Sequence, residues 1–129
     1  MNRKGFTLIE LLVAMVILTV VAMSLGRFVG NFLHAVGTST VRTIGTAVAT
    51  EQIELVRARN TTVSYPTLVA TFNNANITGF PGYPRMQRTT RVVRTTRNVP
   101  QADYTTVTVT VTEPTMGTAI NLTVVVAAP

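Results

Sequence analysis

The chain has 129 residues and a mass of 13.9 kDa, which leaves room for one small domain. Hydrophobic residues make up 47% of it and charged residues only 12%, a balance that excludes an intrinsically disordered chain. With no Cys, one His and five acidic residues, the composition excludes disulfides and thiolate metal sites and leaves little for an acid/base pair. We therefore expect no enzyme activity, no cofactor and no bound metal, while the net charge of +6 permits anionic partners.

The chain begins with a basic segment that is followed by a long apolar run. The run from Phe6 to Leu25 contains four polar residues, and about 20 apolar residues are enough to cross a hydrocarbon core of about 30 Å as a helix. Arg3 and Lys4 precede the run, so the positive-inside rule predicts a cytoplasmic amino terminus and export of the chain that follows. A cleaved secretory signal is the alternative, but the run is long and no A-x-A site follows it.

Glu10 is the one charged residue inside this apolar run. A carboxylate in the middle of a membrane helix costs about 2.5 to 3.5 kcal/mol, and less near the interface, so it normally has a partner. Arg3 and Lys4 precede the span, and Arg27 lies about 25 Å further along at about 1.5 Å per residue. We therefore expect another chain to supply the partner of Glu10. The alternative is that Glu10 lies at the headgroup level, where its desolvation is partial.

The stretch from Arg3 to Ala14 resembles the amino-terminal signal of type IV prepilins and type II secretion pseudopilins; it reads R-K-G-F-T-L-I-E-L-L-V-A. The resemblance implies that a membrane aspartyl peptidase removes the basic leader between Gly5 and Phe6 and methylates the new amine of Phe6. It also implies that Glu10, the fifth residue after the cut, pairs with the terminal amine of a neighbouring subunit during filament assembly. A glycine before the scissile bond fits this chemistry, because it lets the peptide lie extended in a narrow cleft.

The same resemblance implies the partners and the location of the protein. The partners are other pilin or pseudopilin subunits, the prepilin peptidase and methyltransferase, and an inner-membrane assembly platform. The chain is first a single-pass protein of the inner membrane, with a cytoplasmic amino terminus and an exported head, and then part of a cell-surface or periplasmic filament. We expect a minor pilin or pseudopilin that enters or initiates a type IV pilus or a type II secretion-like filament.

The rest of the chain predicts an α+β fold, in which a long amino-terminal helix packs against a small carboxy-terminal antiparallel sheet, as in pilins. Apolar residues continue at helical spacing and no proline occurs before Pro66, so the helix is expected to reach about Arg57 or Arg59. The expected segments are a leader peptide at 1–5, a transmembrane and assembly helix at 6–26, an amphipathic continuation of the helix at 27–59, a variable loop region at 60–88 and the β-sheet head at 89–129.

Three β-branched runs predict the strands of the head, at 91–99, 104–112 and 119–127, and residues 113–117 predict a hairpin connection. Residues 106–112 alternate strictly between Thr and Val. We therefore expect Val107, Val109 and Val111 to face the helix and the threonines to face outward. This tail resembles the carboxy-terminal sheet of PilV-like minor pilins and of I-type minor pseudopilins.

Five arginines, Arg85, Arg88, Arg91, Arg94 and Arg97, recur at every third residue. On a strand this period alternates between faces, so Arg91 and Arg97 are expected to share one face and Arg94 to take the other. One interpretation is a competence pilin that contacts DNA phosphates through Arg88, Arg91, Arg94 and Arg97 during uptake. The other is that the charges keep a sheet edge from pairing with another chain. Aromatic side chains that stack on bases are sparse nearby, which favours the second interpretation.

Overall fold

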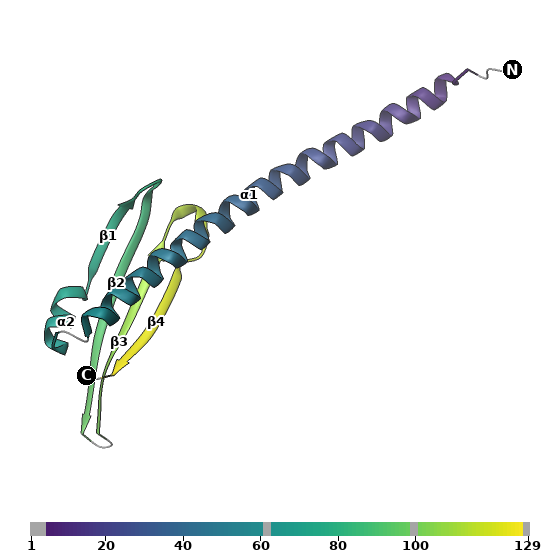
Figure 1. Cartoon of the computed structure of the whole chain (residues 1–129). Helices are drawn as coiled ribbons and strands as arrows, with labels where there is room; N and C mark the ends of the chain where they lie inside the picture. The colour runs from purple at the N-terminus through teal and green to yellow at the C-terminus, as the bar shows by residue number, and fades with distance from the viewer. Residues whose placement is uncertain (1–4, 61–62, 99–100, 128–129) are drawn as a thin grey trace. The chain divides into compact units, whose positions relative to one another are not determined.

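The computed structural model describes residues 5–60, 63–98 and 101–127 (Figure 1). The chain divides into two compact units, one up to Gly37 and one, the head, from Thr38 onward. Its elements in chain order are helix α1 (Leu8–Asn60), helix α2 (Tyr65–Phe72), strands β1 (Ala75–Phe80), β2 (Tyr83–Asn98) and β3 (Gln101–Thr112), a 3-10 turn (Pro114–Met116), and strand β4 (Ile120–Ala127). The predicted α+β fold, a long apolar amino-terminal helix with an antiparallel sheet, is confirmed.

Helix α1 is continuous over 53 residues and belongs to both units. Arg57 and Arg59 lie in its last turn, where positive side chains interact favourably with the carboxy-terminal end of the helix dipole. The predicted end near these two residues agrees with the observed end at Asn60. Within the head, the helix buries one stripe of residues against the sheet, and apart from two adjacent residues they recur three or four positions apart. The stripe consists of Val41, Gly45, Ala49, Gln52, Ile53, Val56 and Asn60.

The sheet has the strand order β1-β2-β3-β4, and each strand is antiparallel to the next. We call the face that packs against α1 the helix-covered face and the opposite one the open face. Val107, Val109 and Val111 of β3 are fully buried on the helix-covered face, as the alternation of Thr and Val predicts. The threonines between them are half-exposed or exposed on the open face. Burial of these valines, at about 25 cal/mol per Å² of apolar surface, stabilises the packing of sheet and helix.

Gly45 allows α1 to approach the sheet closely. A Cβ atom at this position would lie 2.7 Å from Cε of Met116 and 3.0 Å from Cδ1 of Ile120. Since carbon atoms in contact are normally about 3.5 to 4.0 Å apart, a larger residue would have to push these side chains away. The glycine therefore costs some helix propensity and permits tight packing against the 3-10 turn and β4.

The structure corrects the prediction of a loop region at 60–88. Residues 65–72 form α2, which contributes three buried side chains to the core, Tyr65, Leu68 and Phe72. Residues 75–80 form β1, and positive φ occurs at Gly79, near the end of this strand, and at Gly82, in the turn that leads into β2. This polar, glycine-rich segment has little apolar periodicity, which is why it predicts loops. Burial of α2 and pairing of β1 with β2 nevertheless stabilise regular structure here.

Strand β2 begins at Tyr83, earlier than the predicted start at 91. Its first half contains few β-branched residues and is held as a strand by β1 on one side and, from Gln87 onward, β3 on the other. Strand β4 begins at Ile120, one residue after the predicted start. The predicted hairpin connection between β3 and β4 contains the 3-10 turn, and the last predicted residue of the first strand, Val99, lies outside the described residues.

Candidate functional site

The residues that precede α1 include the predicted processing site. Gly5 and Phe6 are exposed and not helical, and the Phe6 side chain is 87% exposed. Nothing approaches the position of a Cβ atom on Gly5 within 4 Å. The Gly5–Phe6 peptide bond therefore lies in an exposed, non-helical segment that a peptidase can reach. Arg3 and Lys4, the predicted leader charges, lie outside the described residues.

Thr7 and Glu10 close the amino-terminal end of α1 together. The backbone N–H of Glu10 donates to Oγ1 of Thr7 at 3.4 Å, and the backbone N–H of Thr7 donates to Oε2 of Glu10 at 3.5 Å. This reciprocal pair is a capping box, in which each side chain satisfies a backbone donor that the helix leaves unpaired. Both distances are at the long end for hydrogen bonds, so the capping contact is weak.

The local contact supplies no positive charge to the Glu10 carboxylate. Among residues 5–60, 63–98 and 101–127, the structure has no ion pair to this carboxylate. The helix dipole favours a negative charge in the first turn, but by only about 0.3 to 1 kcal/mol. That is less than the cost of a carboxylate inside a membrane helix, so the capping contact does not replace a cationic partner.

The first unit consists of apolar helix without a core of its own. Every described residue up to Gly37 is exposed, and α1 is the one helix in the described part of the chain that is long and apolar enough to cross a membrane. The hydroxyls of Thr19 and Ser24 donate to the carbonyls of Met15 and Val20, each at 2.8 Å. Because these polar groups are satisfied within the helix, they add little to the cost of placing it in lipid.

The five arginines of β2 are divided between the two faces of the sheet. Arg85, Arg91 and Arg97 lie on the open face, whereas Arg88 and Arg94 lie on the helix-covered face. As strand alternation predicts, Arg91 and Arg97 share one face and Arg94 lies on the other. The four residues predicted as a polyanion contact therefore do not form one continuous surface.

Arg94 is engaged by groups of its own chain. Its Nε and Nη2 donate to the two carboxylate oxygens of Asp103 at 2.9 and 2.7 Å, and its guanidinium lies 5.1 Å from the centre of the Tyr65 ring. The hydroxyl of Tyr65 donates to the carbonyl of Val126 at 3.4 Å. The hydrogen bonds from Arg94 lower the pKa of Asp103, and burial raises the pKa of Tyr65. This group connects β2, β3, α2 and β4.

Arg88 is buried between β2 and its neighbours. Its Nη1 donates to the carbonyl of Val48 in α1 at 3.5 Å, and its guanidinium lies 5.6 Å from the centre of the Phe80 ring in β1. Desolvation lowers the pKa of Arg88, and the nearby charge of Glu51 acts in the opposite direction. Arg88 thus holds α1, β1 and β2 together and is not presented to a large external anion.

The structure also corrects the prediction of edge protection. β2 is an inner strand, because β1 pairs with it as far as Thr90 and β3 pairs with it from Gln87 onward. Arg85 and Arg88 therefore protect no edge. In the described part of the chain, no strand pairs with the β1 side of β2 beyond Thr90, although the backbone N–H of Val92 donates to Oδ1 of Asn73 at 3.1 Å. Only along this part of β2, around Arg91 and Arg97, can charge oppose pairing with another chain.

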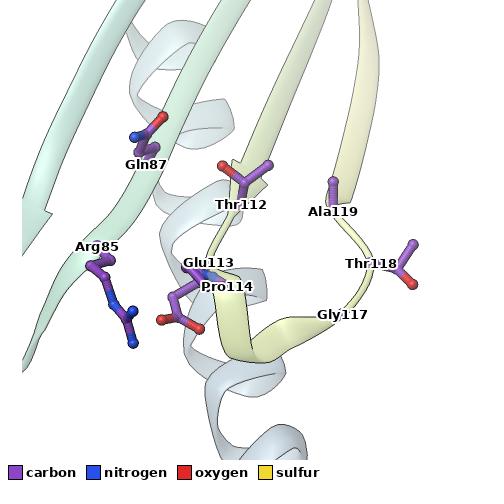
Figure 2. A pocket seen from close by; sticks show the side chains of 8 residues that line it. All are labelled: Arg85, Gln87, Thr112, Glu113, Pro114, Gly117, Thr118 and Ala119. Carbon is purple, nitrogen blue, oxygen red and sulfur yellow. The ribbon is translucent and has the colours of Figure 1, made fainter.

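An open depression of about 330 Å³ lies where β2, β3 and the 3-10 turn meet, and Figure 2 shows its lining. The side chains of Arg85 and Glu113, two of its lining residues, point toward each other (Figure 2). Hydrogen bonds from Thr115 lower the pKa of Glu113, and the charge of Arg85 adds to this effect. The carboxylate is thus occupied in capping the turn. Within the described ranges, no three His, Cys, Asp or Glu side chains are close enough to hold a metal ion.

Residues 1–26 match the family model described as the prokaryotic N-terminal methylation motif, a type IV prepilin-like signal. Neither the comparison with curated proteins nor the one with solved structures finds a match. The motif, the apolar helix and the antiparallel head fit a membrane-anchored α+β protein with a pilin-like fold. More particularly, the motif indicates a precursor that a prepilin peptidase processes and that assembles with other pilins as a structural subunit.

Sequence reasoning missed two parts of the site. The capping box had a signal in the sequence, because the T-x-x-E pattern of Thr7 and Glu10 stands directly before the apolar run. The contact of Arg94 with Asp103 and Tyr65 had none, since these residues meet only through the hairpin of β2 and β3 and the packing of α2.

Proposed function

We propose that this protein is a minor pilin or pseudopilin subunit that a prepilin peptidase cleaves between Gly5 and Phe6 and methylates on Phe6. The observation that carries the proposal is the methylation motif at 1–26, placed on an apolar helix that continues into an antiparallel head. Its role is structural: it enters a type IV pilus or type II secretion-like filament, or initiates one. The assembly platform of the inner membrane and the other subunits are its partners.

The charge of Glu10, for which the described residues supply no ion-pair partner, supports this role. Cleavage before Phe6 creates an amine four residues from Glu10, and methylation keeps that amine cationic. When a second subunit packs beside the first in lipid, its amine supplies the charge that the described residues of the first chain lack. A buried pair of this kind offsets its desolvation only with good geometry, so it sets the axial position of neighbouring subunits more than it adds stability.

The charges around the apolar helix support one orientation in the membrane. Arg3 and Lys4 stand before the run and only Arg27 follows it before Arg42, so the amino terminus stays in the cytoplasm. The head is then exported as a single-pass protein of the inner membrane. From there it joins a filament in the periplasm or at the cell surface.

Co-expression with a prepilin peptidase tests the processing step. We expect the intact mass of the membrane-extracted protein to correspond to a chain that lacks residues 1–5 and carries one methyl group on Phe6. The matched control is the same chain with a Gly5→Leu substitution, which places a side chain next to the scissile bond and should retain the leader. Retention of the leader by the unsubstituted chain, in cells that process a known prepilin, contradicts the proposal.

The alternative function is DNA uptake through the arginines of β2. Its support is the open face, where Arg91 and Arg97 share one surface with Arg85 and no acidic residue of β2 or β3 lies beside them among the side chains described. Arg88 and Arg94 are engaged within the chain, which weakens this alternative. The double variant R91E/R97E tests it: DNA uptake should fall with filaments intact if this alternative holds, and should stay unchanged for a purely structural subunit.

A further inference from the structure

The two outer strands of the sheet carry no charged side chain. β1 and β4 are the outer strands (Figure 1), and neither 75–80 nor 120–127 contains Lys, Arg, Asp or Glu. Unpaired N–H and C=O groups at an edge pair readily with another strand, and proteins commonly oppose this with charges, proline or a bulge. The register of β1 shifts between Thr78 and Phe80, whereas β4 pairs with β3 over its eight residues without a shift. β4 is thus the less protected edge.

Strand direction restricts what can pair with β4. Because each strand is antiparallel to the next, β1 and β4, the first and last of four, run in opposite directions. When two heads stand side by side in the same orientation, β4 of one meets β1 of the other as an antiparallel neighbour. The helix-covered faces of both sheets then lie on the same side. The two sheets can therefore continue into one another.

Two β4 strands cannot join two heads into one continuous sheet while both heads keep the same orientation. An antiparallel pair of β4 strands turns one head end for end, which two chains anchored in one membrane in the same orientation cannot adopt. A parallel pair keeps the direction but places the helix-covered face of one sheet beside the open face of the other. The shared orientation of the two copies rests on the function proposed above.

The outer strands β1 and β4 carry side chains of the same kind on each face of the sheet: apolar on the helix-covered face and polar on the open face. On the helix-covered face, β1 presents Ile77, which is 46% exposed, and β4 presents Leu122 and Val124, which are half-buried. Pairing brings these apolar side chains together and removes part of their surface from water. On the open face, both edges present exposed amide and hydroxyl side chains: Asn76, Thr78, Asn121 and Thr123.

We propose that β4 of one head pairs in antiparallel fashion with β1 of a second copy, with Asn76 opposite Thr123 and Ile77 opposite Leu122. This register uses the part of β4 before its last residues, where the carbonyls of Val126 and Ala127 already accept hydrogen bonds from Tyr65 and Asn60. Since both edges are uncharged, pairing brings no arginine of one copy directly opposite an arginine of the other.

Single cysteines test the pairing without background, because the chain has no cysteine. Full-length N76C and T123C chains with different epitope tags are co-expressed with the peptidase, and the isolated membranes are oxidised. Opposite residues of antiparallel strands have Cα atoms about 4.5 to 5.5 Å apart, within the range for a disulfide. We expect a disulfide-linked dimer that carries both tags. Its yield should be at least about tenfold higher than the yield from the control pair T89C and T123C, because disulfide geometry is specific. Thr89 lies on the same open face but in the inner strand β2.

A further variant guards against cross-links from random collision. N121K places a charge beside the paired segment of β4, and we expect it to reduce the N76C–T123C dimer to the level of the control pair. A disulfide dimer of the T123C chain with itself at the same yield, or no dimer above the control, overturns the proposal. The intact mass of the monomer from the same membranes reports leader removal. A processed chain without cross-link contradicts the edge pairing alone, whereas a retained leader contradicts the proposed function.

Discussion

The two units of the chain differ in how their apolar side chains are covered. Up to Gly37, large side chains such as Leu8, Leu18 and Phe28 are more than half exposed. In the head, Val107 and Val109 are fully buried under α1. The head thus covers its own core, whereas the first unit depends on lipid or on the helices of other chains. Changes in the first unit should therefore alter assembly, and changes in the head should alter stability.

The largest effect is expected at Glu10. We expect Glu10→Val to be processed normally and to enter filaments at least about tenfold less than the wild type, because removing one partner of a buried ion pair costs about 3 to 5 kcal/mol. The measurement is the ratio of protein in sheared filaments to protein in membranes, by quantitative blot.

Glu10→Gln separates charge from capping. Gln serves in a capping box as well as Glu does, so this variant keeps the contact with Thr7 and removes only the charge. We expect it to assemble as poorly as Glu10→Val. Wild-type assembly of Glu10→Gln would show that the capping contact, and not a cationic partner, is what filaments require.

The largest effect on stability is expected where α2 enters the core. Leu68 is fully buried, and Leu68→Ala should lower the free energy of unfolding by about 2 to 5 kcal/mol through lost burial and the cavity left behind. Urea unfolding of the full chain in detergent, followed by tyrosine fluorescence, measures this change. The exposed Thr71→Ala on the same helix is the control and should stay within about 0.5 kcal/mol. Equal effects of both substitutions would mean that α2 is not part of the core.

A smaller loss is expected from adding one methyl group at Gly45. A Cβ atom would lie 2.7 Å from Cε of the buried Met116, so overpacking of about 1 to 3 kcal/mol should outweigh a gain of about 1 kcal/mol in helix propensity. Gly45→Ala should therefore destabilise the head by up to about 2 kcal/mol. At Gly37, in the same helix, nothing lies within 4 Å of a Cβ atom, and Gly37→Ala should stabilise the helix by up to about 1 kcal/mol. Opposite signs in thermal unfolding, followed by circular dichroism, support the close packing seen at Gly45. The same sign at both positions contradicts it.

The smallest effect concerns the exposed pair of Arg94 and Asp103. Its hydrogen bonds lower the pKa of Asp103 in the folded state, so the contribution to stability is full above the unfolded-state pKa. It is lost as the pH falls through the lowered, folded-state pKa. We expect Asp103→Asn to flatten the acid side of the profile of urea midpoint against pH. Arg97→Ala, on the open face of the same strand, should leave that profile unchanged; an equal change would assign the effect to general charge.

The helix and the main core strand could be predicted because their signals are local. Alternation of Thr and Val on β3 predicts the buried face of the sheet, and helical spacing without proline predicts α1 as far as its last turn. α2 could not be predicted, since eight residues do not form a stable helix without tertiary contacts. The roles of Arg88 and Arg94 depend on contacts that no local pattern shows: Arg88 contacts Val48, 40 residues away, and Arg94 contacts Asp103 across the hairpin of β2 and β3.

Sequence by itself determined the apolar run with its lone carboxylate at Glu10, and it predicts a leader and a processing site at the Gly5–Phe6 bond. Each of these depends on residue order alone, because a linear motif and a single helix need no distant contact. Only the tertiary structure decided which arginines are engaged and which remain on the open face. It also made β2 an inner strand and left β1 and β4 as edges, since strand order follows from pairing across the whole head.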